Sequence, residues 1–191
     1  MSEPRITSGT WRQTGPLIRA FGSLAGRSMG TQPPQVFLVL GRTKRLFWGW
    51  LMFAGGLMPG GKLPRRETEL IILRVATLAG SAYERAHHEK IGKRAGVTPQ
   101  DLAAVTVGPS DGHWNAREVA LLTAVDELHH TKDLTDASWA ALREHLDERR
   151  SVEFLLLTGH YEMLATALNT LRIKPDPPRA AARRSAPRPG S

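Results

Sequence analysis

The sequence contains no cysteine among its 191 residues. This absence excludes a disulfide framework, a thiolate metal site and a cysteine nucleophile. Aromatic residues make up only 6% of the chain, and no apolar run reaches the roughly 18 residues that a membrane-spanning helix needs. The beginning of the chain also lacks the apolar core of a secretory signal. We therefore expect a soluble, cytoplasmic protein that does not use a membrane as a partner.

Acidic residues are few relative to basic ones, with 18 Asp and Glu against 26 Lys and Arg and a net charge of +8. Such an excess raises nucleic acid as a partner. The tail from Asp176 onward holds four arginines and one acid, so it carries +3 of that excess. Elsewhere, basic residues are scattered among acidic ones and form no stripe interleaved with aromatic side chains. This distribution favours a solvated tail and no specific nucleic-acid partner.

No part of the chain alternates apolar and polar residues with the period of a strand, whereas apolar residues recur at helical spacing. The fold class predicted is all-α. Residues 1–34 are rich in Gly, Ser, Thr and Pro and are expected to form an irregular arm with one short helix near residues 17–24. Residues 35–173 are expected to form the helical domain. Residues 174–191, rich in Pro, Ala and Arg, are expected to be a disordered basic tail.

Capping signals divide the domain into helices. Thr98 suits a helix N-cap, with Pro99 at the first helical position and Asp101 in the first turn. Asn115 can cap a further helix, with Glu118 at its third position in a box-like arrangement. A further helix is expected from Thr135 or Asp136, and the last helix from Ser151. The apolar residues that these last two helices are expected to bury are Trp139, Leu142, Leu146, Leu155, Leu156, Met163, Leu164, Leu168 and Leu171.

The stretch SAYERAHHEK, residues 81–90, places polar side chains at helical spacing. Ser81, Glu84 and His88 lie three or four residues apart and therefore share one helical face. Glu69 lies on the preceding apolar helix, and a short antiparallel turn would bring it to the height of His88. A carboxylate beside an imidazole in a partly dry crevice can transfer protons. We expect Glu84 and His88 to be the catalytic acid–base pair, with Glu69 orienting or polarising.

The same spacing also fits less specific interpretations. Glu84 and His88 would equally well form a surface pair worth only about 0.3 kcal/mol. His87 is rotated by about 100° from His88, so only one of the two histidines points into a shared pocket. His160 could line that pocket or be an ordinary core or interface histidine. The candidates for substrate binding are Ser81, Tyr83 and His160.

Two E-x-x-H sequences, residues 84–87 and 127–130, raise a di-iron helical protein as an alternative. Glu69 and Glu162 would supply the remaining carboxylates. The motif arises easily in helices that contain Glu and His, and the histidines of the second sequence suit the C-terminal end of a helix dipole. We therefore assign no metal site.

Residues 63–102, LPRRETELIILRVATLAGSAYERAHHEKIGKRAGVTPQDL, and residues 117–146 resemble the carboxymuconolactone decarboxylase family, which also holds alkylhydroperoxidase D-like proteins. The resemblance spans residues 33–172 and rests on the order LPxRExEL, an apolar helix, YExxxH and RAGVT. It implies an all-α, alkylhydroperoxidase D-like helical bundle that assembles as an oligomer. The tryptophans and phenylalanines of residues 46–58 suit an interface between copies, so we expect a homo-oligomer.

The redox branch of that family carries a glutamate followed, after eleven residues, by a cysteine. A second cysteine follows after two further residues, and a histidine after three more. In this chain Glu69 and His88 match the glutamate and the histidine, while Ser81 and Glu84 stand at the cysteine positions. Serine forms neither a sulfenic acid nor a disulfide, so thiol peroxidase activity is not expected.

The decarboxylase branch needs neither a thiol nor a cofactor. The resemblance to it implies a lyase or isomerase that performs cofactor-independent acid–base chemistry, decarboxylation or isomerisation, on a small carbonyl or lactone substrate. The alternative is a non-catalytic oligomeric scaffold of the same fold that binds a ligand.

Overall fold

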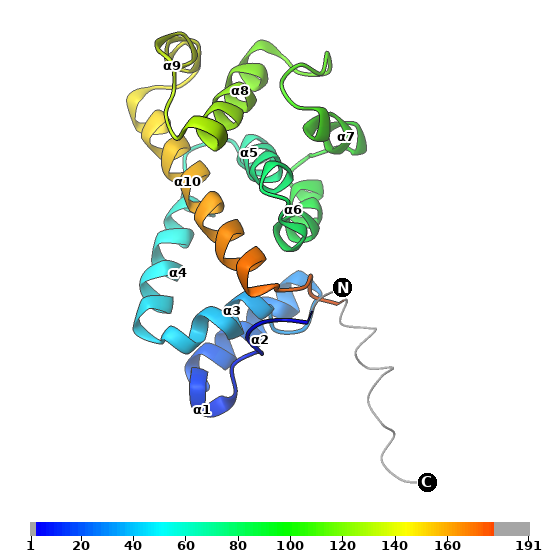
Figure 1. The fold of residues 1–191 in the computed structure, drawn as a ribbon, viewed down its shortest axis with the longest axis vertical. Helices are drawn as coiled ribbons and strands as arrows, with labels where there is room; N and C mark the ends of the chain where they lie inside the picture. Colours follow the sequence, from blue (N-terminus) through cyan, green and yellow to red (C-terminus); the bar gives the residue numbers. More distant parts are fainter. Residues whose placement is uncertain (1–2, 178–191) are drawn as a thin grey trace. The chain divides into compact units, whose positions relative to one another are not determined.

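The computed structural model describes residues 3–177, apart from the side chain of Met29 (Figure 1). All of the longer regular elements in that range are helices, so the predicted all-α class is confirmed. None of these helices is both long and apolar enough to cross a membrane. The elements are α1 (Trp11–Thr14), α2 (Pro16–Met29), α3 (Gln35–Leu40), the 3-10 helix η1 (Gly41–Thr43), α4 (Arg45–Leu57), α5 (Arg65–Leu78), α6 (Ala82–Arg94), α7 (Pro99–Val107), α8 (Ala116–Thr131), α9 (Asp136–Arg143) and α10 (Glu148–Leu171).

The helices are divided between two compact units. The first unit comprises the residues up to Phe53 together with those from Thr170 onward, and the second comprises Ala54–Asn169. The division differs in position from the three regions expected from the sequence, whose boundaries stay predictions.

An aromatic cluster forms the centre of the first unit. Phe47 is completely buried. The rings of Phe21, Phe37 and Trp50 lie 6.3, 6.1 and 5.8 Å from it between centroids, distances at which aromatic pairs attract one another. Met52, in the same helix α4, stays 80% exposed. The apolar segment of residues 46–58 is therefore only partly buried, and the homo-oligomer stays a prediction.

Residues expected to be irregular form α2, which is longer than the short helix predicted near residues 17–24. Pro16 occupies the first turn, and Gly30 caps the end in the left-handed conformation with φ 69°. Proline suits the first helical position and glycine suits a left-handed cap, so both helix boundaries were encoded locally.

The beginning of the expected basic tail is docked in the first unit. Asp176 is only 5% exposed, and its carboxylate accepts a hydrogen bond of 3.0 Å from the backbone N–H of Gln35. Gln35 is the first residue of α3, where backbone N–H groups have no partner within the helix. Residues 178–191, the rest of the expected tail, lie outside the described residues.

Helix α5 is the centre of the second unit, with α6, α7 and α8 packed around it (Figure 1). Every residue from Thr68 to Ala76 is buried. Arg74 lies within this run, and its guanidinium Nε donates to Asp126 Oδ1 on α8 at 2.6 Å and its Nη1 to the Val105 carbonyl at 2.7 Å. A buried charge is tolerable only when it is paired in this way.

The predicted caps form in the second unit. Thr98 and Asn115 each accept a hydrogen bond from the backbone N–H three residues on, at 3.1 and 3.0 Å. Helix α9 begins at Asp136, as expected. Helix α10 begins at Glu148 and not at Ser151, because the Asp147 carboxylate accepts the backbone N–H of the third helical residue at 2.7 Å.

Helix α10 does not bury all the apolar residues that the sequence suggested. Its buried apolar face repeats through Phe154, Leu157, Tyr161, Leu164 and Leu168. The core assignment was wrong for four residues, which are 36–53% exposed: Trp139, Leu155, Leu156 and Met163. Each residue along a helix is turned by about 100°, so the three on α10 point away from its buried face although their neighbours lie on it.

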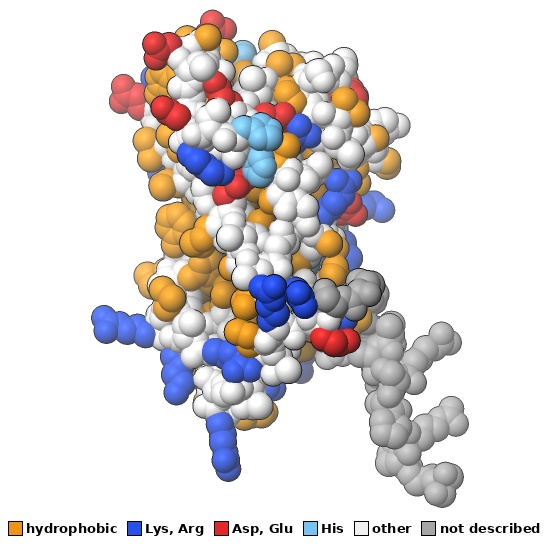
Figure 2. All heavy atoms as spheres, in the orientation of Figure 1, with side chains coloured by type: hydrophobic (Ala, Val, Ile, Leu, Met, Phe, Trp, Pro, Cys, Tyr) orange, Lys and Arg blue, Asp and Glu red, His pale blue; other side chains and the backbone are white. Residues whose placement is uncertain are grey.

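The two units also differ in charge. The second unit holds thirteen Lys and Arg against sixteen Asp and Glu, so the basic excess belongs to the rest of the chain. Acidic side chains gather near α9, while Lys and Arg project around α1 to α4 (Figure 2). The candidate site described next therefore lies in the acidic unit.

Candidate functional site

Helices α5 and α6 bring Glu69 and His88 into contact. Gly80, with φ 61°, forms the tight turn between the helices, and glycine adopts this conformation without strain. His88 Nδ1 lies 2.7 Å from Glu69 Oε2, and the two side chains are 8% and 0% exposed. The proximity expected from matching heights on two antiparallel helices is present.

The partner of His88 in this structure is Glu69 and not Glu84. With the Glu69 carboxylate accepting from Nδ1–H, the imidazole ring is held in one orientation, and Nε2 is the nitrogen that does not bond to Glu69. Arg65 lies at the outer side of this pair, with Nη2 3.7 Å from Glu69 Oε1. The contact with His88 is thus established, and the orienting role expected for Glu69 stays a prediction.

Glu84 is a buried carboxyl group without a hydrogen-bond partner among the described residues. It is 2% exposed, and both of its carboxyl oxygens are enclosed. Burial raises the pKa of Glu84 to about 8; the hydroxyl of Ser81 opposes this rise, and the negative charge of Glu162 adds to it. At neutral pH Glu84 therefore carries its proton and can act as an acid. Ser81, at the start of α6, is itself 1% exposed.

Helix α10 adds two aromatic groups. The Tyr161 ring stands perpendicular to that of His88 at a centroid distance of 5.0 Å, and His160 contacts Tyr161 at 5.1 Å. Burial and the nearby charge of His88 lower the pKa of His160 to about 4, so that this imidazole is neutral at neutral pH.

Tyr161 was not selected from the sequence. Burial raises the pKa of its phenol, and the charges of Glu69 and Glu84 raise it further. Its position on the buried face of α10, beside the candidate His160, is the signal that could have found it.

Tyr83 and His87 form a pair of their own. Their rings stack at a centroid distance of 4.6 Å with an interplanar angle of 25°. The structure therefore separates the roles of the histidine doublet, with His88 in contact with Glu69 and His87 stacked on a tyrosine. Tyr83 is buried, and its role toward a substrate stays a prediction.

The residues nominated for a di-iron site do not converge. In residues 3–177 no three or more His, Asp or Glu side chains are grouped closely enough to hold a metal ion. Glu162 instead binds His129 on α8, with 2.7 Å between Oε1 and Nδ1.

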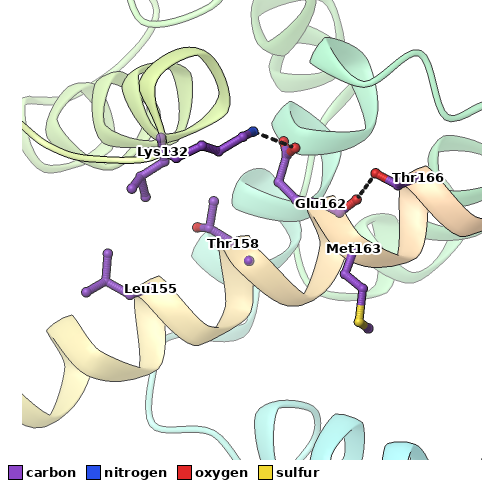
Figure 3. A pocket seen from close by; sticks show the side chains of 8 residues that line it. Lys132, Leu155, Thr158, Glu162, Met163 and Thr166 are labelled. Carbon is purple, nitrogen blue, oxygen red and sulfur yellow. Dashed lines mark hydrogen bonds and ion pairs between the residues drawn. The ribbon is translucent and has the colours of Figure 1, made fainter.

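A groove lies between α8 and α10 (Figure 3). Its volume of 490 Å³ falls within the range of small-molecule sites. Glu162 lines the groove, and its charge also acts on Glu84. The groove residues are Leu128, Lys132, Leu155, Thr158, Gly159, Glu162, Met163 and Thr166.

The fold is shared with solved structures of alkylhydroperoxidase-like proteins. A peroxidase-related protein from Ralstonia eutropha with an alkylhydroperoxidase AhpD core is 20% identical, with a TM-score of 0.80 over 92% of this chain and 93% of that one. A peroxidase-related protein from a Silicibacter species is 15% identical, with a TM-score of 0.78 over 92% and 95%. The debrominase Bmp8, in complex with 2,3,4-tribromopyrrole, is 16% identical, with a TM-score of 0.73 over 96% and 97%. At these identities the likeness establishes the fold.

Residues 44–127 match the sequence model of the carboxymuconolactone decarboxylase family. The matched segment contains Glu69, Ser81, Glu84 and His88. The resemblance read from the sequence is thereby confirmed, including its cysteine-free character. A search of curated proteins found no significant match.

Proposed function

We propose that this protein is a cofactor-independent enzyme that transfers protons on a small carbonyl or lactone substrate, in isomerisation or decarboxylation. The observation that carries the proposal is the buried Glu84 carboxyl group, whose pKa of about 8 keeps it protonated at neutral pH. An acid with a pKa near the working pH is effective in both giving and taking a proton. His88, oriented by Glu69 at 2.7 Å, is the complementary base.

An unsaturated lactone illustrates the chemistry. His88 Nε2 takes a proton from the carbon next to the carbonyl, and the electron pair of that C–H bond moves into a dienolate. Glu84 donates its proton, as a hydrogen bond or completely, to the carbonyl oxygen where negative charge develops. Return of a proton to the far carbon of the dienolate moves the double bond and restores the carbonyl. No atoms or electrons are gained or lost, and no cofactor takes part.

The names of the structural relatives suggest other chemistry for those proteins. One of the Bmp8 structures is of a cysteine-to-alanine variant. The present chain has Ser81 and Glu84 at the family's cysteine positions and no cysteine elsewhere, so it has no thiol for peroxide reduction or for a cysteine-dependent step. Acid–base chemistry is the part of the family's repertoire that its residues support.

The proposal is tested with α-angelica lactone, whose isomerisation to the conjugated lactone is followed by ultraviolet absorbance. The wild-type chain should accelerate the reaction above the buffer rate. Loss of a general acid or base typically lowers a rate by about 10²–10⁴-fold, so Glu84→Gln and His88→Ala should each lose most of the activity.

The matched control is His87→Ala, which removes the neighbouring histidine but leaves the His88–Glu69 contact intact. It should keep the wild-type rate. If neither the lactone nor a panel of small ketones in deuterated water shows catalysed proton exchange, the enzyme proposal is wrong, and the non-catalytic ligand-binding scaffold is the better account.

A further inference from the structure

The groove between α8 and α10 has a hydroxyl group at its floor that no described neighbour uses. Thr158 is 1% exposed, and its Oγ1 has no hydrogen-bond partner within residues 3–177. Thr166, about two helical turns further along α10, donates to the Glu162 carbonyl at 2.9 Å (Figure 3). The threonines that likewise donate to the carbonyl four residues earlier are Thr14, Thr68, Thr77, Thr106 and Thr131.

A buried hydroxyl without a partner is unfavourable, because it has lost its bonds to water. Thr158 is therefore available to donate to a ligand oxygen that reaches the floor of the groove. The hydroxyl lies one helical turn from Glu162, the groove residue whose charge acts on Glu84. A ligand bound to Thr158 would consequently lie beside Glu162, whose charge acts on the proposed acid.

The walls of the groove are suited to an apolar body. Leu128, Leu155 and Met163 line it, and the last two are 36% and 53% exposed. Exposed apolar side chains gathered around a concave surface are typical of small-molecule sites.

The charges around the groove disfavour an anion. Glu162 lines it, and Asp133 and Asp136 line an adjoining groove that shares Lys132 and Leu128 with it. Lys132 is already engaged, since its ammonium donates to the His129 carbonyl at 2.8 Å and lies 3.5 Å from Glu162 Oε2 (Figure 3). A carboxylate ligand would thus meet more negative than positive charge.

We propose that this groove binds a small, uncharged, mostly apolar carbonyl compound whose oxygen accepts a hydrogen bond from Thr158. This inference rests on the proposed function, because it takes the groove to be the substrate site of that enzyme. A carbonyl compound without a carboxylate can be isomerised but has no carbon dioxide to lose. Isomerisation, and not decarboxylation, is then the reaction of this enzyme.

The test compares two probes of nearly the same shape, benzylacetone and hydrocinnamate, in which a methyl ketone replaces a carboxylate. Binding to the full-length wild-type chain is measured by titration calorimetry at neutral pH. Benzylacetone should bind more tightly by about tenfold or more, because like charges near the groove repel the carboxylate. Equal binding, or tighter binding of hydrocinnamate, overturns the inference.

A matched pair of variants tests the role of the hydroxyl. Thr158→Val removes the unpartnered hydroxyl and should weaken benzylacetone binding by about three- to tenfold, as expected for one lost hydrogen bond. Thr131→Val removes a hydroxyl outside the groove that is already bonded to the Glu127 carbonyl within α8, and should leave binding unchanged. An equal effect of the two substitutions overturns the assignment of Thr158.

Methyl NMR on methionine-labelled protein locates the ligand. The Met163 signal, assigned by its loss in Met163→Leu, should shift on addition of benzylacetone. Shifts confined to other methionines overturn the groove as the site. If benzylacetone binds at Met163 but no proton exchange is catalysed, only the proposed function is refuted. If the lactone is turned over but Thr158→Val has no effect on the rate, only the assignment of the groove as the substrate site is refuted.

Discussion

Replacing Glu84 by glutamine tests the central electrostatic feature of the site without requiring a substrate. The carboxyl group of Glu84 has an ordinary pKa of 4.5 in the unfolded chain and about 8 in the folded one. Between these two values the folded chain holds a proton that the unfolded chain has released. Wild-type stability is therefore greatest below the lower pKa and is lost as the pH rises through the upper one. Glutamine stays neutral throughout.

The size of the effect follows from the two pKa values. Each pH unit within this window changes the free energy of unfolding by about 1.4 kcal/mol per proton. From about pH 5 to about pH 8, the free energy of unfolding of Glu84→Gln should therefore rise by about 3–4 kcal/mol relative to that of the wild type. This figure allows for the gradual end of the titration near the upper pKa. The stability advantage of Glu84→Gln over the wild type therefore grows toward alkaline pH, because only the wild type must ionise a buried carboxyl group.

Urea unfolding followed by circular dichroism at the two pH values measures this difference, since the denaturant midpoint and slope yield the free energy of unfolding. Glu89→Gln is the control, because Glu89 lies on the same helix but pairs with Arg85 at the surface, at 2.9 Å. Its effect should stay within about 1 kcal/mol and should not grow toward alkaline pH. A Glu84→Gln effect that is the same at both pH values would refute the raised pKa and with it the role of Glu84 as an acid.

Three further outcomes are expected. Asp176→Ala should lower the free energy of unfolding by about 1 kcal/mol, as the loss of a helix cap typically does. If this substitution leaves stability unchanged, the bond from Asp176 to Gln35 does not stabilise the fold. Deletion of residues 178–191, by contrast, should leave the melting temperature within about 4 °C of the wild-type value. Light scattering at micromolar concentration should give the mass of a homo-oligomer, because Met52 and other apolar side chains of α4 are exposed, and a monomer mass would contradict this expectation. Metal-free protein should show no dithiol-dependent reduction of an alkyl hydroperoxide, and sustained turnover would overturn the interpretation of Ser81 and Glu84.

The sequence by itself determined the features that depend on neighbours along the chain. Helical periodicity was sufficient for the all-α class, and the caps at Thr98 and Asn115 were readable because a cap and its acidic partner are three residues apart. The contact between Glu69 and His88 was also foreseeable. It requires only two adjacent helices and a tight turn, so that distances along the chain translate directly into heights.

The tertiary structure decided what depends on distant parts of the chain. The pKa of Glu84 is set by its enclosure and by Glu162, which lies on α10, and no local pattern reveals such burial. The helices packed against α10 also decide which of its apolar residues face the core. Leu157 is buried, whereas Leu155 and Met163 line a groove. The partner of His88 was decided in the same way, because the packing of α5 against α6 holds its Nδ1 2.7 Å from Glu69 Oε2.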